Sequence, residues 1–348
     1  MRRIDNPPNP YDGIHQDWLE PPPPAAVEVY EEAARSILSE NDSPDLPFRW
    51  SVNPYRGCQH ACSYCYARPY HEFLGLGAGT DFDTKLVVKK NAAELLEAAI
   101  AGKQWAGESI NFSGVTDCYQ PLEAVYRLTR ACLEVCLKHR NRAVVVTKSY
   151  LVMRDADRLA ALHRVAGAAV YQSIPFADDA TAKLIEPYAP PPSRRFEAMR
   201  KLSDAGVPVG VLVAPVIPGL NDREAPEVLR RAAEAGAGSA SFIPLRLSGS
   251  VQPVFLERLR AAMPDRARRV EARIRDIRGG RLSESRFGAR MRGSGPYWRS
   301  IEELFRVSMN RYGLRGLRRP DALPDRPPPA AKPLTQLTVQ GLLPFPEP

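Results

Sequence analysis

Three cysteines stand close together in the stretch RGCQHACSYCYARPYH, at positions 58, 62 and 65. Cysteines spaced in this way bind metals or carry out redox chemistry. A tetrahedral zinc site or an ordinary iron–sulfur cluster takes four protein ligands, and this stretch supplies no fourth cysteine. With six cysteines in 348 residues, the chain does not have the composition of a disulfide framework. We therefore expect a metal or redox site with one position left open by the cysteines.

Two ordinary kinds of site compete for this interpretation. A zinc ion could recruit His60 or His71, because mixed cysteine and histidine sites are common. His60 lies between Cys58 and Cys62 in a tight loop, where its side chain has difficulty reaching the same ion. Cys62 and Cys65 also have the spacing of a catalytic Cys-x-x-Cys redox pair.

Polar residues follow several predicted strands. Thr116 and Asp117 come directly after one apolar run, and Lys148 and Ser173 stand at the ends of the next two. In parallel βα architectures, ligands bind at the carboxyl ends of the strands. Polar loops also begin at strand ends for structural reasons alone, but several such residues beside a cysteine cluster favour a binding site.

The rest of the chain predicts the sheet that carries these residues. Short apolar runs rich in β-branched residues alternate with longer helical patterns, which is typical of βα units around a parallel sheet. The predicted strands are 109–114, 143–149, 168–174, 207–215 and 238–245. The fold class is therefore α/β.

Cys132 and Cys136 receive a different interpretation. In the pattern VYRLTRACLEVCLKH they share one predicted helical face with Val125, Leu128 and Val135. Buried cysteine behaves as a small hydrophobic residue. We expect both to be inert core residues.

The cysteine motif also resembles that of a known family. The pattern Cys-x3-Cys-x2-Cys, with Tyr64 directly before the third cysteine, is similar to the signature of the radical S-adenosylmethionine (SAM) superfamily. CQHACSYCYAR together with SGVTDCYQPLE resembles the branch around spore photoproduct lyase, and more closely a group of bacterial radical SAM proteins related to it. The resemblance spans about residues 48–245 and implies a partial, six-stranded (β/α)6 TIM-like barrel, here with an Arg-rich C-terminal extension.

The resemblance also implies the cofactors. Three thiolates would hold three irons of a [4Fe–4S] cluster, and SAM would chelate the fourth. An electron from a flavodoxin- or ferredoxin-like donor would then cleave SAM to a 5′-deoxyadenosyl radical that abstracts a substrate hydrogen. The implied cluster ligands are Cys58, Cys62 and Cys65. The implied SAM contacts are Thr116 and Asp117 at the methionine end, Lys148 and Ser173 at the carboxylate and ribose, and Ala214 at the adenine.

One position departs from the lyase pattern. The lyase has a hydrogen-donating cysteine directly before the residue pair that corresponds to Thr116 and Asp117, and this chain has Val115 there. Cys118 lies on the other side of the pair. It is a candidate thiyl donor, with an ordinary semi-buried cysteine as the alternative.

Charge supplies the remaining signal. The chain carries a net charge of +8, and residues 266–319 contain sixteen arginines, no lysine and five acidic residues. Between 264 and 277 an apolar stripe indicates a helix whose arginines face away from the core. The following glycine-rich loop interleaves Arg286, Arg290 and Arg292 with aromatic residues, which suits phosphate contact and base stacking. The alternative is a solvated basic face.

These features suggest four segments. They are a Pro-rich segment 1–46 with a short helix at 27–40, a core at 47–262, an Arg-rich extension at 263–319 and a Pro-rich tail at 320–348. No apolar run approaches the ~20 residues of a membrane span, and the N-terminus lacks the apolar region of a signal peptide. We expect a cytoplasmic radical SAM enzyme that repairs or modifies nucleic acid. The alternatives are a radical SAM enzyme acting on a small molecule or peptide, and a non-catalytic metal-binding protein.

Overall fold

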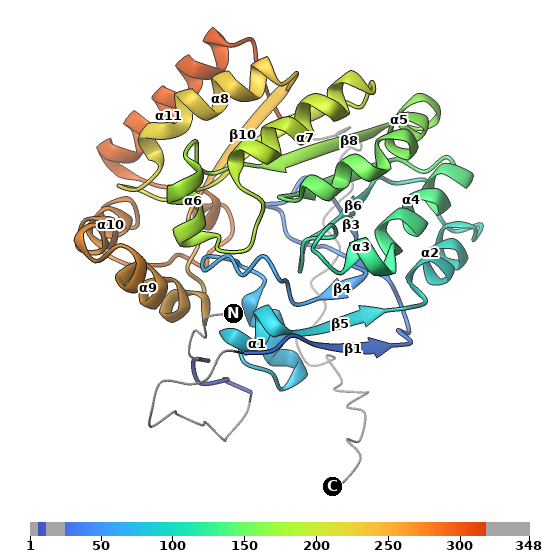
Figure 1. Cartoon of the computed structure of the whole chain (residues 1–348). Helices are drawn as coiled ribbons and strands as arrows, with labels where there is room; N and C mark the ends of the chain where they lie inside the picture. The colour runs from blue at the N-terminus through green and yellow to red at the C-terminus, as the bar shows by residue number, and fades with distance from the viewer. Residues whose placement is uncertain (1–5, 12–24, 318–348) are drawn as a thin grey trace, which may run out of the picture. The chain divides into compact units, whose positions relative to one another are not determined.

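A mostly parallel sheet forms the centre of the protein. The computed structural model describes residues 6–11 and 25–317 (Figure 1). The strands that pair side by side in parallel are β3 (Trp50–Val52), β6 (Ile110–Phe112), β7 (Ala143–Thr147), β8 (Ala168–Ser173), β9 (Val209–Val216) and β10 (Ser239–Pro244). β2 (Leu38–Glu40) adds an antiparallel edge beside β3, and β11 (Arg315–Gly316) pairs with β10 at the other edge. The α/β fold expected from the sequence is confirmed.

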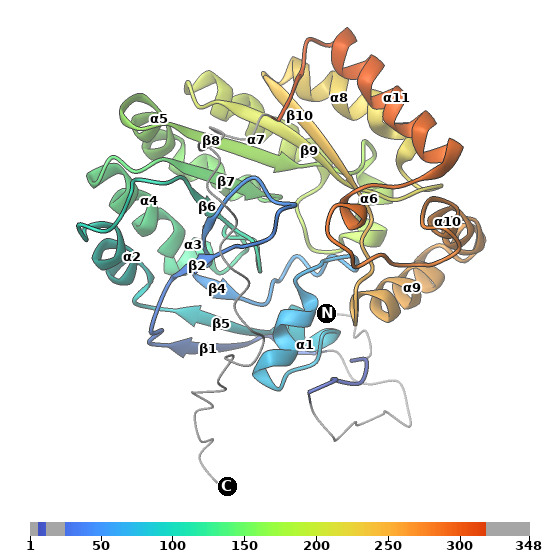
Figure 2. The ribbon, with the colours of Figure 1, turned by 180° about the vertical axis from the view of Figure 1, so that it is seen from behind.

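Helices cover the outer face of this sheet (Figures 1 and 2). They are α2 (Ala92–Ile100), α4 (Leu128–Lys138), α5 (Ala156–Val165), α7 (Pro192–Asp204) and α8 (Ala225–Glu234), with the short α3 (Glu123–Tyr126) before α4 and α6 (Asp179–Ile185) before α7. Alternate residues of β7 and β8 on the inner face are only partly buried, whereas the residues between them pack against these helices. Val145, Val170 and Val211 accordingly have no exposed surface.

The predicted helical face around Cys132 is right in part. Cys132 and Cys136 are fully buried in the core from α4, as expected. The prediction for Val125 is wrong, because its side chain is 77% exposed. Arg127 adopts a left-handed conformation (φ 54°) that ends α3 and starts α4 in a new direction, so the helical period does not continue across it.

The short helix expected at 27–40 is wrong. β1 (Glu28–Glu32) instead pairs in parallel with β5 (Lys85–Lys89), which also pairs with β4 (Tyr55–Arg56). Ladder hydrogen bonds to a strand more than fifty residues away override the local helical preference of this stretch. The short helical segments α1 (Thr80–Thr84) and η1 (Arg68–Leu74) lie between β4 and β5 in the chain.

The C-terminal part adds three helices to the described chain: α9 (Val251–Ala262), α10 (Pro264–Ile277) and α11 (Gly295–Arg311). The apolar stripe of α10 is buried as predicted, through Ala267, Val270, Ile274 and Ile277. The ring of Phe305 on α11 stacks on Phe242 of β10 with 4.1 Å between centroids. The predicted Pro-rich tail lies outside the described residues. Within those residues, no helix is long and apolar enough to cross a membrane.

Candidate cofactor site

The cysteine loop starts directly after β4. Cys58 and Cys62 are buried, Cys65 is partly exposed, and all three thiols are free. Two tight turns coil this segment, because the Ala61 and Cys65 amides donate to the Cys58 and Cys62 carbonyls, both at 3.2 Å. Gly57 enters the loop at φ +73°, and a Cβ there would lie 2.9 Å from the Phe82 carbonyl oxygen. The loop can therefore approach α1 only with glycine at this position.

A buried arginine, Arg68, fixes the backbone of the cysteine loop. Arg68 donates to the Cys62 carbonyl through Nε at 3.1 Å and through Nη2 at 3.0 Å. Its guanidinium also binds the Asp83 carboxylate at 2.9 Å, and neither side chain is more than slightly exposed. A planar fork can bind a carbonyl and a carboxylate at once, which fixes the backbone between the second and third cysteines.

Asp117 lies in the loop that follows β6 and accepts hydrogen bonds from several donors. It accepts hydrogen bonds from the Thr147 hydroxyl at 2.6 Å, the Lys148 amide at 2.8 Å and the Tyr119 amide at 2.9 Å. His60 of the cysteine loop places Nδ1 3.4 Å from Asp117 Oδ2 without the alignment of a hydrogen bond. Burial favours the neutral acid, but His60 and these donors outweigh it and hold the pKa of Asp117 well below its usual range.

The other predicted strand-end residues form a connected chain. Lys148 Nζ donates to Ser173 Oγ at 3.1 Å, and that hydroxyl donates to the Ala214 carbonyl at 3.1 Å. Thr116 uses its hydroxyl to bind the Gly57 carbonyl at 2.5 Å, next to the first cysteine. The structure thus brings together all the residues that the sequence placed at strand ends, along β6 to β9 and beside the cysteine loop.

Sequence reasoning missed a second, fully buried layer. The Tyr64 hydroxyl donates to Glu186, which accepts a 2.5 Å bond from Arg195. Arg195 also donates to the Ser173 carbonyl at 2.9 Å, and Lys148 Nζ lies 5.6 Å from the Tyr64 ring centroid. The layer joins the cysteine loop to β8. Tyr64 belongs to the cysteine motif, but Glu186 and Arg195 match no local motif, so no sequence signal identifies them as its partners.

Both histidines near the loop lie close to other polar groups. His71 Nε2 is 2.8 Å from the Lys85 carbonyl oxygen, and burial lowers the pKa of His71 to about 4. His60 faces Asp117 and Cys58, which raise its pKa to about 10 although burial opposes this. Among residues 6–11 and 25–317, no group of three His, Cys, Asp or Glu side chains is arranged to hold an ion.

Cys118 lies in the hydrophobic core. Its side chain has no exposed surface, and burial raises the pKa of its thiol well above the usual value. Its amide binds Ser113 Oγ at 3.3 Å, and its carbonyl accepts a 2.6 Å bond from the Thr129 hydroxyl. A hydrogen donor must reach its substrate, so this placement does not support the donor role, which stays a prediction.

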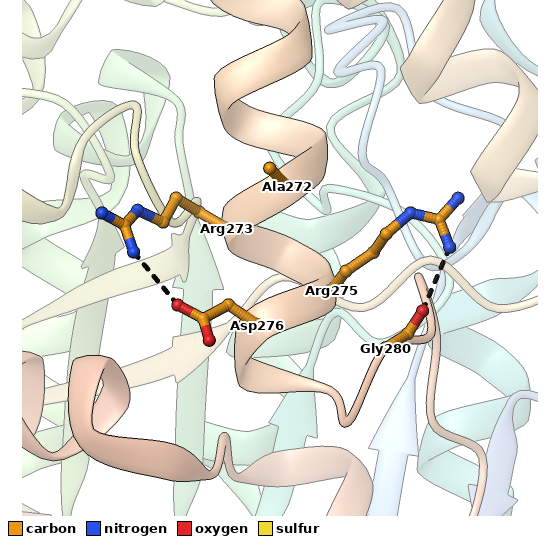
Figure 3. A pocket seen from close by; sticks show the side chains of 5 residues that line it. All are labelled: Ala272, Arg273, Arg275, Asp276 and Gly280. Carbon is orange, nitrogen blue, oxygen red and sulfur yellow. Dashed lines mark hydrogen bonds and ion pairs between the residues drawn. The ribbon is translucent and has the colours of Figure 1, made fainter.

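Surface shape alone does not identify the site. A shallow depression of about 460 Å³ lies on the outer side of α10, lined by Ala272, Arg273, Arg275, Asp276 and Gly280 (Figure 3). Arg273 pairs with Asp276 at 3.1 Å, and Arg275 donates to the Gly280 carbonyl at 3.1 Å. None of the cysteines or strand-end residues lines it.

Comparison with known proteins confirms the resemblance read from the cysteine motif. A family model described as the radical SAM superfamily matches residues 52–232. An uncharacterised protein of Mycobacterium tuberculosis is 34% identical over 242 residues, which cover 69% of this chain and 71% of that protein. An uncharacterised protein of Methanocaldococcus jannaschii is 31% identical over 199 residues, covering 57% of this chain and 71% of that protein.

Solved structures show the same fold. Spore photoproduct lyase complexed with dinucleoside spore photoproduct superposes with a TM-score of 0.57. The two sequences are 17% identical, and the match covers 83% of this chain and 81% of the lyase. At this identity the likeness concerns the fold alone, and it agrees with the partial barrel expected from the sequence.

Proposed function

The chain belongs to the radical SAM superfamily, and on that premise we propose that Cys58, Cys62 and Cys65 bind a [4Fe–4S] cluster next to a SAM site at the strand ends. The donor set fits such a cluster, because one loop offers three free thiols. The remaining cysteines of the described chain are buried in the core. The cluster and SAM, when bound, supply one-electron cleavage of SAM to a 5′-deoxyadenosyl radical that takes a hydrogen atom from the substrate.

Two cationic side chains near the cysteine loop favour the thiolate form of its cysteines. Burial, together with the neighbouring Cys58, raises the pKa of Cys65 to about 11, although Arg68 and Lys148 act in the opposite direction. These two cations therefore stabilise thiolates in a site that otherwise disfavours them.

The polar side chains at the strand ends are the observation that supports a SAM site here. Asp117 is held ionised, and Lys148 stays cationic in a partly buried position, so the site offers both charges to a zwitterionic ligand.

Anaerobic reconstitution tests the proposal. The protein should bind iron and sulfide, absorb broadly near ~400 nm and release 5′-deoxyadenosine from SAM on reduction. Changing Cys58, Cys62 or Cys65 to alanine should abolish the release. Cys132→Ala is the matched control, because it removes a core thiol and should cost only about 1–2 kcal/mol of stability. Stoichiometric zinc without iron in anaerobically purified protein would contradict the proposal.

The substrate class proposed for this enzyme is nucleic acid, supported by the Arg-rich extension. Its arginines are less uniformly available than the sequence implied, because Arg286 pairs with Glu284 at 2.9 Å and Arg290 pairs with Asp45 at 2.5 Å. Arg292 is exposed and stays a candidate phosphate contact. A flavodoxin- or ferredoxin-like electron donor and a cytoplasmic location remain predictions.

A further inference from the structure

Exposed aromatic side chains gather beside the cysteine loop. Tyr66 follows the third cysteine and is 50% exposed, and Tyr70 and Phe73 on η1 are 51% and 60% exposed. Phe287 of the Arg-rich extension is 60% exposed. With Arg246, which follows β10 at its carboxyl end, these residues make up what we call the mouth surface.

These rings make two separate groups of contacts. The centroids of Tyr70 and Phe73 are 6.3 Å apart, and the ring of Tyr11 lies 4.8 Å beyond Phe73. In the second group, the guanidinium of Arg246 lies 6.0 Å from the Tyr66 ring centroid. Exposed rings in such groups offer flat apolar faces to a ligand.

Arg246 is a cation whose hydrogen-bonding capacity is not used up. Its Nε is buried and has no hydrogen-bond partner within the described part of the chain, and Nη1 has only the sulfur of Met291 at 3.6 Å. The nearby carboxylate of Asp45 is already occupied, because it accepts from Arg290 Nε and from the Gly288 amide at 2.6 Å. An unsatisfied guanidinium in a half-buried position favours a ligand with anionic oxygens.

Arg278 holds the Arg-rich loop against this position. Its buried guanidinium donates to the carbonyls of Leu245 at 3.0 Å, Ala289 at 3.2 Å and Arg292 at 2.7 Å. The loop is thus fixed next to the end of β10. Burial and the neighbouring Arg290 lower the pKa of Arg246, as expected where cations crowd around one carboxylate.

We propose that the mouth surface binds single-stranded nucleic acid, with bases stacked on the exposed rings and a phosphate held by Arg246. It deepens the proposed function, because Tyr66 adjoins Cys65 and a nucleotide bound here lies beside the proposed radical site. A single strand fits better than a duplex because its base faces are free to stack. Aromatic faces beside an anion-binding arginine match the alternation of base and phosphate, which an acidic peptide lacks.

Fluorescence anisotropy with the reconstituted full-length protein tests this inference. The probes are labelled oligothymidylate, oligouridylate and a DNA duplex of the same length, titrated from about 50 to about 200 mM salt. The double variant Tyr70→Ala/Phe73→Ala should bind single strands about tenfold or more weakly with an unchanged salt slope, because stacking is not ionic. Arg246→Gln should lower the log–log slope by about 0.7, as expected for one lost phosphate contact on a single strand.

Matched controls are Tyr30→Ala on β1 and Arg306→Gln on α11, which remove an exposed ring and an exposed arginine elsewhere. Both should bind like the wild type. The inference is overturned if the wild type binds no single strand at about 50 mM salt, if duplex binds as tightly, if polyglutamate competes as well as oligonucleotide, or if the aromatic variant matches its control. SAM cleavage without nucleic acid is measured separately, so a protein that cleaves SAM but binds no strand loses this inference and keeps its radical chemistry.

Discussion

Arg195 and Glu186 form an ion pair of 2.5 Å in which neither side chain has any exposed surface. The pair lies between the cysteine loop and β8, because Glu186 accepts from Tyr64 and Arg195 donates to the Ser173 carbonyl. Burial alone would favour a neutral Glu186, but Arg195 and Lys148 keep its pKa below the usual value. The pair therefore fixes the position of Tyr64, the residue directly before the third cysteine.

Glu186→Gln should strongly destabilise the protein. The amide keeps the shape but leaves Arg195 as an uncompensated buried cation, so we expect a loss of about 3 kcal/mol in the free energy of unfolding. Urea denaturation measures it. The control Glu227→Gln breaks an exposed pair with Arg230 and should cost no more than about 1 kcal/mol. Equal losses in the two variants would show that the buried pair has no special role.

Asp117→Asn should separate SAM binding from cluster assembly. The substitution preserves the size of a side chain that accepts from Thr147 and from the Lys148 amide, but it removes the negative charge. We expect iron and sulfide content to stay normal while the affinity for SAM falls about tenfold or more, measured by equilibrium dialysis. Asp157→Asn, at an exposed position on α5, is the control. Failed cluster assembly with unchanged SAM affinity in the residual protein would make Asp117 a structural residue.

His71 should make stability depend on acid pH. Burial is the main cause that lowers its folded pKa to about 4, with Arg68 acting in the same direction and the Lys85 carbonyl and Asp81 opposing. Its unfolded value is about 6.5, so the unfolded chain takes up a proton first. Stability is then complete above about pH 6.5 and falls as the pH drops toward 4, by at most about 3 kcal/mol from this group.

His71→Gln provides the comparison for this pH dependence. Glutamine can still donate to the Lys85 carbonyl but does not titrate. The difference in unfolding free energy between wild type and variant should therefore narrow as the pH falls through this window. Parallel pH profiles for the two proteins would rule out His71 as the titrating group.

The sequence predicted what depends on local pattern. The cysteine spacing and the polar residues after β6, β7 and β8 were readable because motif and strand period lie within short windows. β1 was missed because its pairing with β5 is non-local. The Glu186–Arg195 pair was missed because Glu186 ends α6 and Arg195 lies on α7, so the two residues meet only where these helices pack. The arginines of α10 and the following loop were expected to face solvent, yet Arg278 is buried, since carbonyls of distant segments converge on it.

Arg278→Lys should loosen the Arg-rich loop while conserving charge. The arginine serves carbonyls of two segments with one planar fork, and an ammonium on a flexible stem cannot reach the same set. Carbonyls left unsatisfied in a buried position cost about 1–3 kcal/mol each, so we expect a stability loss of about 2 kcal/mol or more.

Hydrogen exchange of the amides of 289–292 should accelerate more than that of α10. The control Arg275→Lys alters a single exposed bond to Gly280 and should change neither quantity. Arg278 holds both this loop and the Leu245 carbonyl, directly before Arg246. A weaker affinity for single strands in Arg278→Lys would therefore show that the placement of these two segments sets the affinity. Unchanged exchange would mean that Asp45 and its bonds to the loop suffice to hold it.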